Sequence, residues 1–154
     1  MTSYKVTLLD RFIIDHLKRY QAPIARFALF VVYFWFGALK IFGTSPANPL
    51  VAGLLQRTLS FISASSFIIY LGLYEMLIGV LWLVPKGERI AIALLVPHLF
   101  TTIGPLILLP AVTWQGFLMP TLEGQYIIKN VVIIALAMTV GAKLEPFKHH
   151  WWQY

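Results

Sequence analysis

Four long apolar stretches, separated by short polar breaks, restrict this chain more than any other feature of its sequence. A helix that crosses a membrane needs about 20 consecutive and mostly apolar residues, and a chain in lipid must satisfy its backbone hydrogen bonds internally. Charged residues make up 12% of the chain, whereas a typical soluble domain has about 25%. We therefore predict an all-α fold, a four-helix transmembrane bundle, with spans at about residues 23–43, 66–85, 90–110 and 125–142.

The chain is expected to form a single integral membrane domain over residues 1–154, because no Gly/Ser-rich linker or low-complexity tract divides it. Cysteine is absent, which excludes disulfides, thiol relays and cysteine-ligated iron–sulfur clusters within the chain. The sequence has no recognisable nucleophile–base pair, phosphate-binding loop or set of metal ligands, so it assigns no catalytic residue, no metal and no evident cofactor. Nucleic acid is not an expected partner, because membrane topology explains the net charge of +6.

The basic residues are distributed unevenly between the two sides of the predicted bundle. Loops on the cytoplasmic side of a membrane carry an excess of lysine and arginine. The loops on one side hold Arg57 alone, and nine basic residues lie on the other side, so both termini are predicted to be cytoplasmic. The nine are Lys5, Arg11, Lys18, Arg19, Arg26, Lys86, Arg89, Lys143 and Lys148.

Two shorter segments outside the spans have helical patterns. The stretch "LLDRFIIDHLKRY", residues 8–20, places apolar and charged residues at helical spacing, which predicts an N-terminal amphipathic helix. This helix either lies on the inner face of the membrane or packs against the cytoplasmic end of the bundle. Residues 49–63 are apolar but contain Gln56 and Arg57, so we expect a short helix over the outer end of the bundle rather than a fifth span.

Four ionisable residues lie inside the predicted spans: Arg26, Lys40, Glu75 and Lys129. Such a residue costs at least about 2.5–3.5 kcal/mol at the centre of an isolated helix, so it is a candidate functional residue by default. Arg26 is a few residues from the cytoplasmic end and is expected to extend its side chain to the headgroups. The other three have no comparably simple explanation.

The spacing of small residues indicates that Glu75 faces a neighbouring helix. Gly72, Glu75 and Gly79 share one face of the second span, and small residues let another helix approach closely. Lys40 lies on a stripe of the first span that points away from lipid. We therefore predict that Glu75 pairs with Lys40, with Lys129 or with both. A polar clasp that only fixes the order of the helices is the alternative explanation of this cluster.

The third span adds polar residues to the same candidate site. His98 is predicted to lie near the membrane midplane, where it is either a hydrogen-bonded packing residue or a contact for a quinone. The outer loops would cover the site, with Trp114 and Phe117 as apolar contacts. The predicted ligand-binding residues are Lys40, Glu75, Lys129, His98, Thr101 and Trp35.

Several motifs together resemble the DoxX-like superfamily of four-span membrane proteins. They are "FGALKIF" at the end of the first span, "YLGLYEMLIGVLWLVP" in the second, "TT" in the third and "LEGQYIIKNVVIIALA" in the fourth. The resemblance covers about residues 22–142 and implies a multi-pass protein of the bacterial inner membrane. The sequence is most similar to the DUF417 branch, whose shared positions are here Gly37, Lys40, Glu75, Gly79, Gly124, Lys129 and Asn130.

The resemblance implies a role in redox or oxidative-stress physiology. Members of the superfamily are linked to thiosulfate:quinone oxidoreduction, to resistance against oxidants such as reactive chlorine, and to assembly with soluble redox enzymes. We therefore expect an accessory protein rather than an enzyme, forming a homo-oligomer or joining a redox partner, whose charge cluster binds a small ligand or a partner subunit.

Two alternatives stay open. One is a small oligomeric transporter, in which the buried charges form an ion or proton path. The other is the membrane subunit of a quinone-linked oxidoreductase, in which Glu75 or His98 handles a proton. The aromatic side chain of Trp35, Tyr33 or Tyr74 would then stack on the quinone head group.

Overall fold

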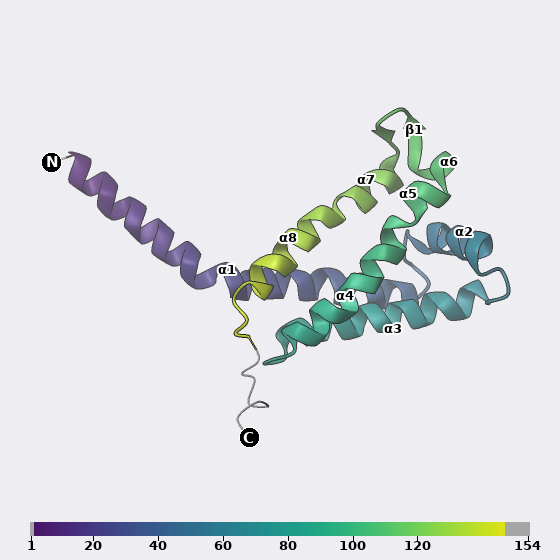
Figure 1. The fold of residues 1–154 in the computed structure, drawn as a ribbon, viewed down its shortest axis with the longest axis horizontal. Coiled ribbons are helices and arrows are strands. Elements are labelled where there is room, and N and C mark those ends of the chain that lie inside the picture. The colour runs from purple at the N-terminus through teal and green to yellow at the C-terminus, as the bar shows by residue number, and fades with distance from the viewer. Residues whose placement is uncertain (1, 147–154) are drawn as a thin grey trace, which may run out of the picture.

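The computed structural model describes residues 2–146, with side chains from Thr7 onward, so Lys148 lies outside the described residues. Within that range the chain is mostly helical (Figure 1). Four helical stretches are long and apolar enough to cross a membrane, and they confirm the predicted all-α architecture. Three have boundaries within a few residues of those predicted, whereas the first begins at residue 7 and not at about 23. The four stretches are Thr7–Ile41, Ala64–Leu83, Glu88–Leu108 and Leu122–Gly141.

The third and fourth stretches each consist of two helices, and the connection between them contains a small hairpin that the sequence did not predict. The hairpin pairs β1 with β2 in antiparallel register, Trp114 opposite Pro120. The elements are α1 (Thr2–Ile41), α2 (Asn48–Thr58), α3 (Ala64–Leu83), α4 (Glu88–Ile103), α5 (Pro105–Leu108), α6 (Pro110–Thr113), β1 (Trp114–Gly116), β2 (Met119–Pro120), α7 (Leu122–Ile128) and α8 (Asn130–Gly141).

The segment predicted as a separate amphipathic helix is the first half of α1, which runs without a break into the first span. Pro23 lies inside this helix and removes one backbone hydrogen bond without ending it. Figure 1 shows the N-terminal part projecting away from the bundle as an arm. Leu9, Phe12 and Leu17 on the arm are exposed, so the alternative in which this segment packs against the end of the bundle is wrong.

The long helices close into a ring. α1 packs most extensively against α3, α3 packs against α4, α4 against α8, and α8 returns to α1. The short helix predicted within residues 49–63 is α2, which lies against α3 and α5. The buried core inside the ring consists of Ala25, Leu29, Tyr33, Ile78, Trp82, Ala91, Leu95, Ala137 and Val140.

α1 and α3 approach each other closely at a pair of glycines. A Cβ atom on Gly37 would lie 2.6 Å from the carbonyl oxygen of Gly72, and one on Gly72 would lie 2.7 Å from that of Gly37. Two turns further along α3, a Cβ on Gly79 would lie 2.7 Å from the backbone nitrogen of Phe34. Side chains cannot occupy these spaces, so the glycines let the two backbones touch, as small residues do between membrane helices. The prediction that this face of the second span meets another helix is confirmed.

Arg26 ties one end of the bundle together through contacts inside the protein, which the sequence did not predict. Its Nη1 lies 2.8 Å from Oε1 of Glu88. Its Nε and Nη2 donate hydrogen bonds to the carbonyl oxygens of Trp82 and Val84, at 2.6 and 3.2 Å. The physical reason is that α3 ends here and leaves carbonyl groups without helical partners, so the guanidinium finds acceptors inside the protein.

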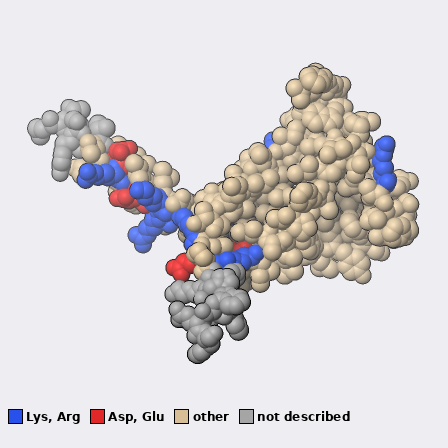
Figure 2. All heavy atoms as spheres, viewed as in Figure 1, with Lys and Arg blue, Asp and Glu red and all other residues tan. Residues whose placement is uncertain are grey.

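The charged residues gather at this same end. Arg89 donates to the backbone carbonyl of Glu145, so the α3–α4 turn and the end of the fourth span lie together. Figure 2 shows most of the visible Lys, Arg, Asp and Glu side chains on the arm and at the adjoining end of the bundle, while the remaining visible surface is almost uncharged. The two ends of the bundle therefore differ strongly in charge.

Replacing Gly72 by alanine is expected to destabilise the fold, because the new Cβ would collide with the backbone of Gly37. Overpacking of this kind costs about 1–3 kcal/mol. Gly53→Ala is a matched control, since a Cβ there would meet Cδ1 of Leu109 at an ordinary 3.7 Å. Thermal unfolding in detergent, followed by tryptophan fluorescence, should show a lower midpoint for Gly72→Ala and not for the control. Equal midpoints would contradict the close approach of α1 and α3.

Candidate functional site

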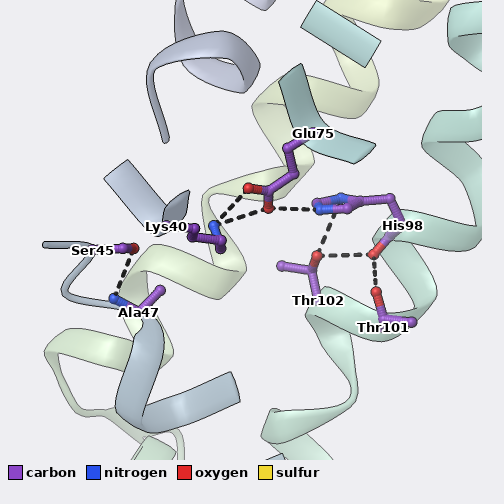
Figure 3. Close-up of polar contacts among 7 residues, drawn as sticks. All are labelled: Lys40, Ser45, Ala47, Glu75, His98, Thr101 and Thr102. Carbon is purple, nitrogen blue, oxygen red and sulfur yellow. Dashed lines mark hydrogen bonds and ion pairs between the residues drawn. The ribbon is translucent and has the colours of Figure 1, made fainter. Parts of the chain in front are cut away.

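An ion pair between Lys40 and Glu75 lies inside the bundle, which is one of the pairings that the sequence left open (Figure 3). Lys40 comes from the last turn of α1 and donates from Nζ to both carboxylate oxygens of Glu75, at 3.0 and 2.7 Å. The Lys40 side chain is 6% exposed and that of Glu75 is 8% exposed. Gly72, one turn before Glu75, makes this pairing possible, because a Cβ there would lie 3.1 Å from Cβ of Lys40.

His98 of α4 binds the other side of the same carboxylate. Its Nε2 lies 2.9 Å from Oε1 of Glu75, and its side chain is 7% exposed. Its Nδ1 lies 3.3 Å from the hydroxyl of Thr102, and the hydroxyls of Thr101 and Thr102 both donate to the backbone carbonyl of His98, at 2.7 and 2.8 Å. Figure 3 shows the carboxylate between the ammonium and the imidazole. We call Lys40, Glu75 and His98 the charge triad.

The geometry fixes which nitrogen of His98 carries the hydrogen toward Glu75. A carboxylate oxygen can only accept, so the contact with Glu75 requires a hydrogen on Nε2. The hydroxyl of Thr102 lies within reach of both Nδ1 and the backbone carbonyl of His98. The ring is therefore held from both of its nitrogens.

Two tyrosines surround His98. The ring of Tyr33 meets it edge-on, with centroids 5.3 Å apart, and the ring of Tyr74 stacks beside it at 6.3 Å. The hydroxyl of Tyr74 donates to the carbonyl of Leu94 at 2.7 Å. The hydroxyl of Tyr33 is buried and has no hydrogen-bond partner within the described residues. One donor beside the charge triad thus lacks an acceptor.

Two of the predicted ligand-binding residues do not join this cluster. Lys129 is exposed, and its Nζ lies 5.0 Å from the ring centroid of Tyr126. It follows the buried Ile127 by two residues, which places it about 200° away around the helix. Trp35 is 63% exposed for the same reason, since it follows the buried Tyr33 by two residues. Periodicity within one span could not settle which side of the helix faces the core.

The predicted lid residues do not cover the charge triad either. Trp114 donates from Nε1 to the carbonyl of Leu106, at 2.9 Å, and so holds the hairpin to α5. Phe117 is 93% exposed at the tip of the hairpin. Thr101 is exposed, and its hydroxyl bonds to the backbone carbonyl of His98 in its own helix and not to the carboxylate.

The sequence placed His98 in the site but missed its bond to Glu75 and the role of Thr102. A signal was present on α4, where Ala91, Leu95 and His98 are spaced four and three residues apart and are all buried. This spacing places the histidine on the core-facing stripe of its helix. The choice of Glu75 as its partner depends on how α3 and α4 pack, which no single-helix pattern contains.

A pocket of about 420 Å³ lies away from the charge triad. It is formed by α2 and the connection from α2 to α3, and none of its lining residues belongs to the triad. They are Pro49, Ala52, Gly53, Leu55, Gln56, Ser60, Ile62 and Ala64. The three triad side chains pack against protein instead, in agreement with their low exposure.

Comparison with protein-family models, with curated proteins and with solved structures finds no match for this chain. The function must therefore be argued from the geometry of the charge triad and from the motifs in the sequence.

Removing the carboxylate of Glu75 should be more harmful than removing the whole ion pair. Glu75→Gln leaves the buried ammonium of Lys40 uncompensated, which costs about 3–5 kcal/mol. Adding Lys40→Met should restore part of the thermal midpoint and of the purified yield. Lys129→Met is the control and should change little, because Lys129 is exposed. Strictly additive effects of the two substitutions would mean that Lys40 and Glu75 are not coupled.

Proposed function

We propose that this chain is a DoxX-like accessory protein of the bacterial inner membrane, acting in redox or oxidative-stress physiology, with the charge triad as its ligand-binding centre. The observation that carries the proposal is a carboxylate shared by an ammonium and an imidazole inside an apolar bundle. Ionisable groups within membrane spans are costly and mark functional sites more often than structural ones. Lys40 and Glu75 are also two of the positions on which the resemblance to the DUF417 branch rests.

The unpartnered hydroxyl of Tyr33 favours a ligand over a purely structural clasp. A clasp requires Lys40 and Glu75 alone, whereas a buried hydroxyl without an acceptor costs about 1–3 kcal/mol. A ligand with a carbonyl or anionic oxygen would accept from this hydroxyl.

The membrane subunit of a quinone-linked oxidoreductase is the second candidate, and the tyrosines around His98 favour it. Tyr33 and Tyr74 present aromatic faces and edges on which a flat head group could stack. Glu75 or His98 would handle a proton at the quinone head group. A partner subunit would supply the electrons, since this chain has no cysteine for a redox relay.

The ligand test uses Tyr33→Phe, which removes one hydroxyl and little else. Tyr70→Phe on the neighbouring helix α3 is the matched control, because Tyr70 is 71% exposed and its hydroxyl lies outside the core. Mass spectrometry of extracts from protein purified in mild detergent should find one small molecule at a constant ratio in the wild type and the control. Tyr33→Phe should lose most of it.

The identity of the bound molecule separates the two candidates. A quinone would favour the oxidoreductase subunit, and another carbonyl-bearing or anionic molecule would favour the accessory protein. A wild type without a bound molecule, together with a Tyr33→Phe variant that is at least as stable, would contradict ligand binding and reduce the charge triad to a clasp.

We further propose that both termini are cytoplasmic and that the N-terminal arm lies on the inner face of the membrane. The nine-to-one distribution of basic residues supports this orientation. The arm's exposed apolar residues, with Arg11, Lys18 and Arg19 between them, suit a surface of apolar lipid and anionic headgroups.

Cysteine labelling can test the orientation, because the chain has no cysteine of its own. Lys86→Cys reports the α3–α4 turn and Gln115→Cys reports the hairpin, and both positions are exposed. A membrane-impermeant maleimide added to intact cells should label position 115 and not position 86. Labelling of position 86 alone would reverse the proposed orientation.

A further inference from the structure

The β1–β2 hairpin ends in a tip of three apolar residues that contact little of the protein. Phe117, Leu118 and Met119 are 93%, 73% and 60% exposed. In water this tip would be an exposed apolar patch, and such patches usually mark interaction sites. Figure 1 shows the hairpin projecting from the bundle at the end away from the arm.

The backbone of the tip accommodates leucine at a position that favours glycine or asparagine. Leu118 has φ of 55°, in the left-handed region that is unfavourable for most side chains. The turn therefore presents a large apolar side chain despite local strain. An apolar contact outside the protein would give that side chain a role.

The base of the hairpin is fixed between α6 and α7, and α7 is the start of the fourth span. The backbone N–H of Thr121 donates to the carbonyl of Thr113 at 3.0 Å, and the hydroxyl of Thr121 donates to the carbonyl of Val112 at 2.7 Å. Gly124 of α7 donates to the same hydroxyl at 3.1 Å and packs against the backbone of Thr113. With a rise of about 3.3 Å per residue along β1, the tip stays within about 10 Å of this base, which adjoins the start of the fourth span at Leu122.

Lipid is the partner that fits this surface. Residues 90–122 contain no Lys, Arg, Asp or Glu, so the hairpin offers no charge by which to recognise a polar partner. The exposed apolar surface continues from the tip onto α7 through Leu122 and Tyr126, and α7 begins a span. Lys129 then lies over the ring of Tyr126, an arrangement typical of the membrane interface.

We propose that Phe117, Leu118 and Met119 insert into the acyl region of the leaflet nearest to α2 and anchor the connection between the third and fourth spans. This anchor holds Thr113, Trp114 and α6 at the membrane surface. It is independent of any ligand at the charge triad.

A spin label at position 117 tests the insertion directly, since Phe117→Cys creates the chain's single thiol. Gln115→Cys, on the same hairpin and also exposed, is the matched control. In phosphatidylcholine/phosphatidylglycerol vesicles, the label at 117 should collide more with oxygen, which concentrates in lipid, and less with a water-soluble nickel chelate. The label at 115 should show the reverse. Met119→Cys keeps Phe117 and must give the same result as 117.

Two outcomes would overturn the proposal. Equal collision with the nickel chelate at positions 117 and 115 would place the tip in water. Protection of position 117 from both oxygen and nickel would mean that protein covers it, as in contact with a second copy or a partner, and not lipid.

Discussion

The carboxylate of Glu75 is the constraint on which the arrangement of the helices depends. A negative charge inside an apolar bundle is tolerated when opposite charge and hydrogen-bond donors surround it. Lys40 supplies the charge from α1, and His98 supplies a second donor from α4. Three of the four helices of spanning length therefore meet at one group, and their order around the ring cannot change without exposing the charge to lipid.

Close packing and electrostatics support each other in this bundle. The contact between Gly37 and Gly72 brings the backbones of α1 and α3 together one turn away from the ion pair. This approach sets the distance at which Nζ of Lys40 can reach both oxygens of Glu75. A bulkier residue at either glycine would separate the helices and also lengthen the ion pair, so one local change would affect packing and charge together.

Among the described residues, two clusters of charged side chains lie in the bundle, with a buried and mostly apolar layer between them. Arg26 and Glu88 hold one end, and the charge triad lies toward the other. On α3 and α4 the residues between them include Ile78, Trp82 and Ala91, each with no exposed surface. On α1, Arg26, Tyr33 and Lys40 follow one another at intervals of seven residues, so a single stripe serves both clusters. The apolar layer separates the charge triad from the end where the basic residues gather.

The sequence by itself determined the number of spanning helices, the approximate bounds of most of them and the presence of a lysine partner for Glu75, with Lys40 and Lys129 as the candidates. Length, hydropathy and the spacing of glycines are local properties, and each is readable along one helix. The tertiary structure alone decided that Lys40 and not Lys129 pairs with Glu75, and that His98 bonds to the same carboxylate. It also decided that Lys129 and Trp35 face outward and that Arg26 closes one end of the bundle. These outcomes depend on the rotation of each helix about its axis and on its neighbours. A long lysine or arginine near a helix end can point to lipid, headgroup or core, and the packing partners determine which.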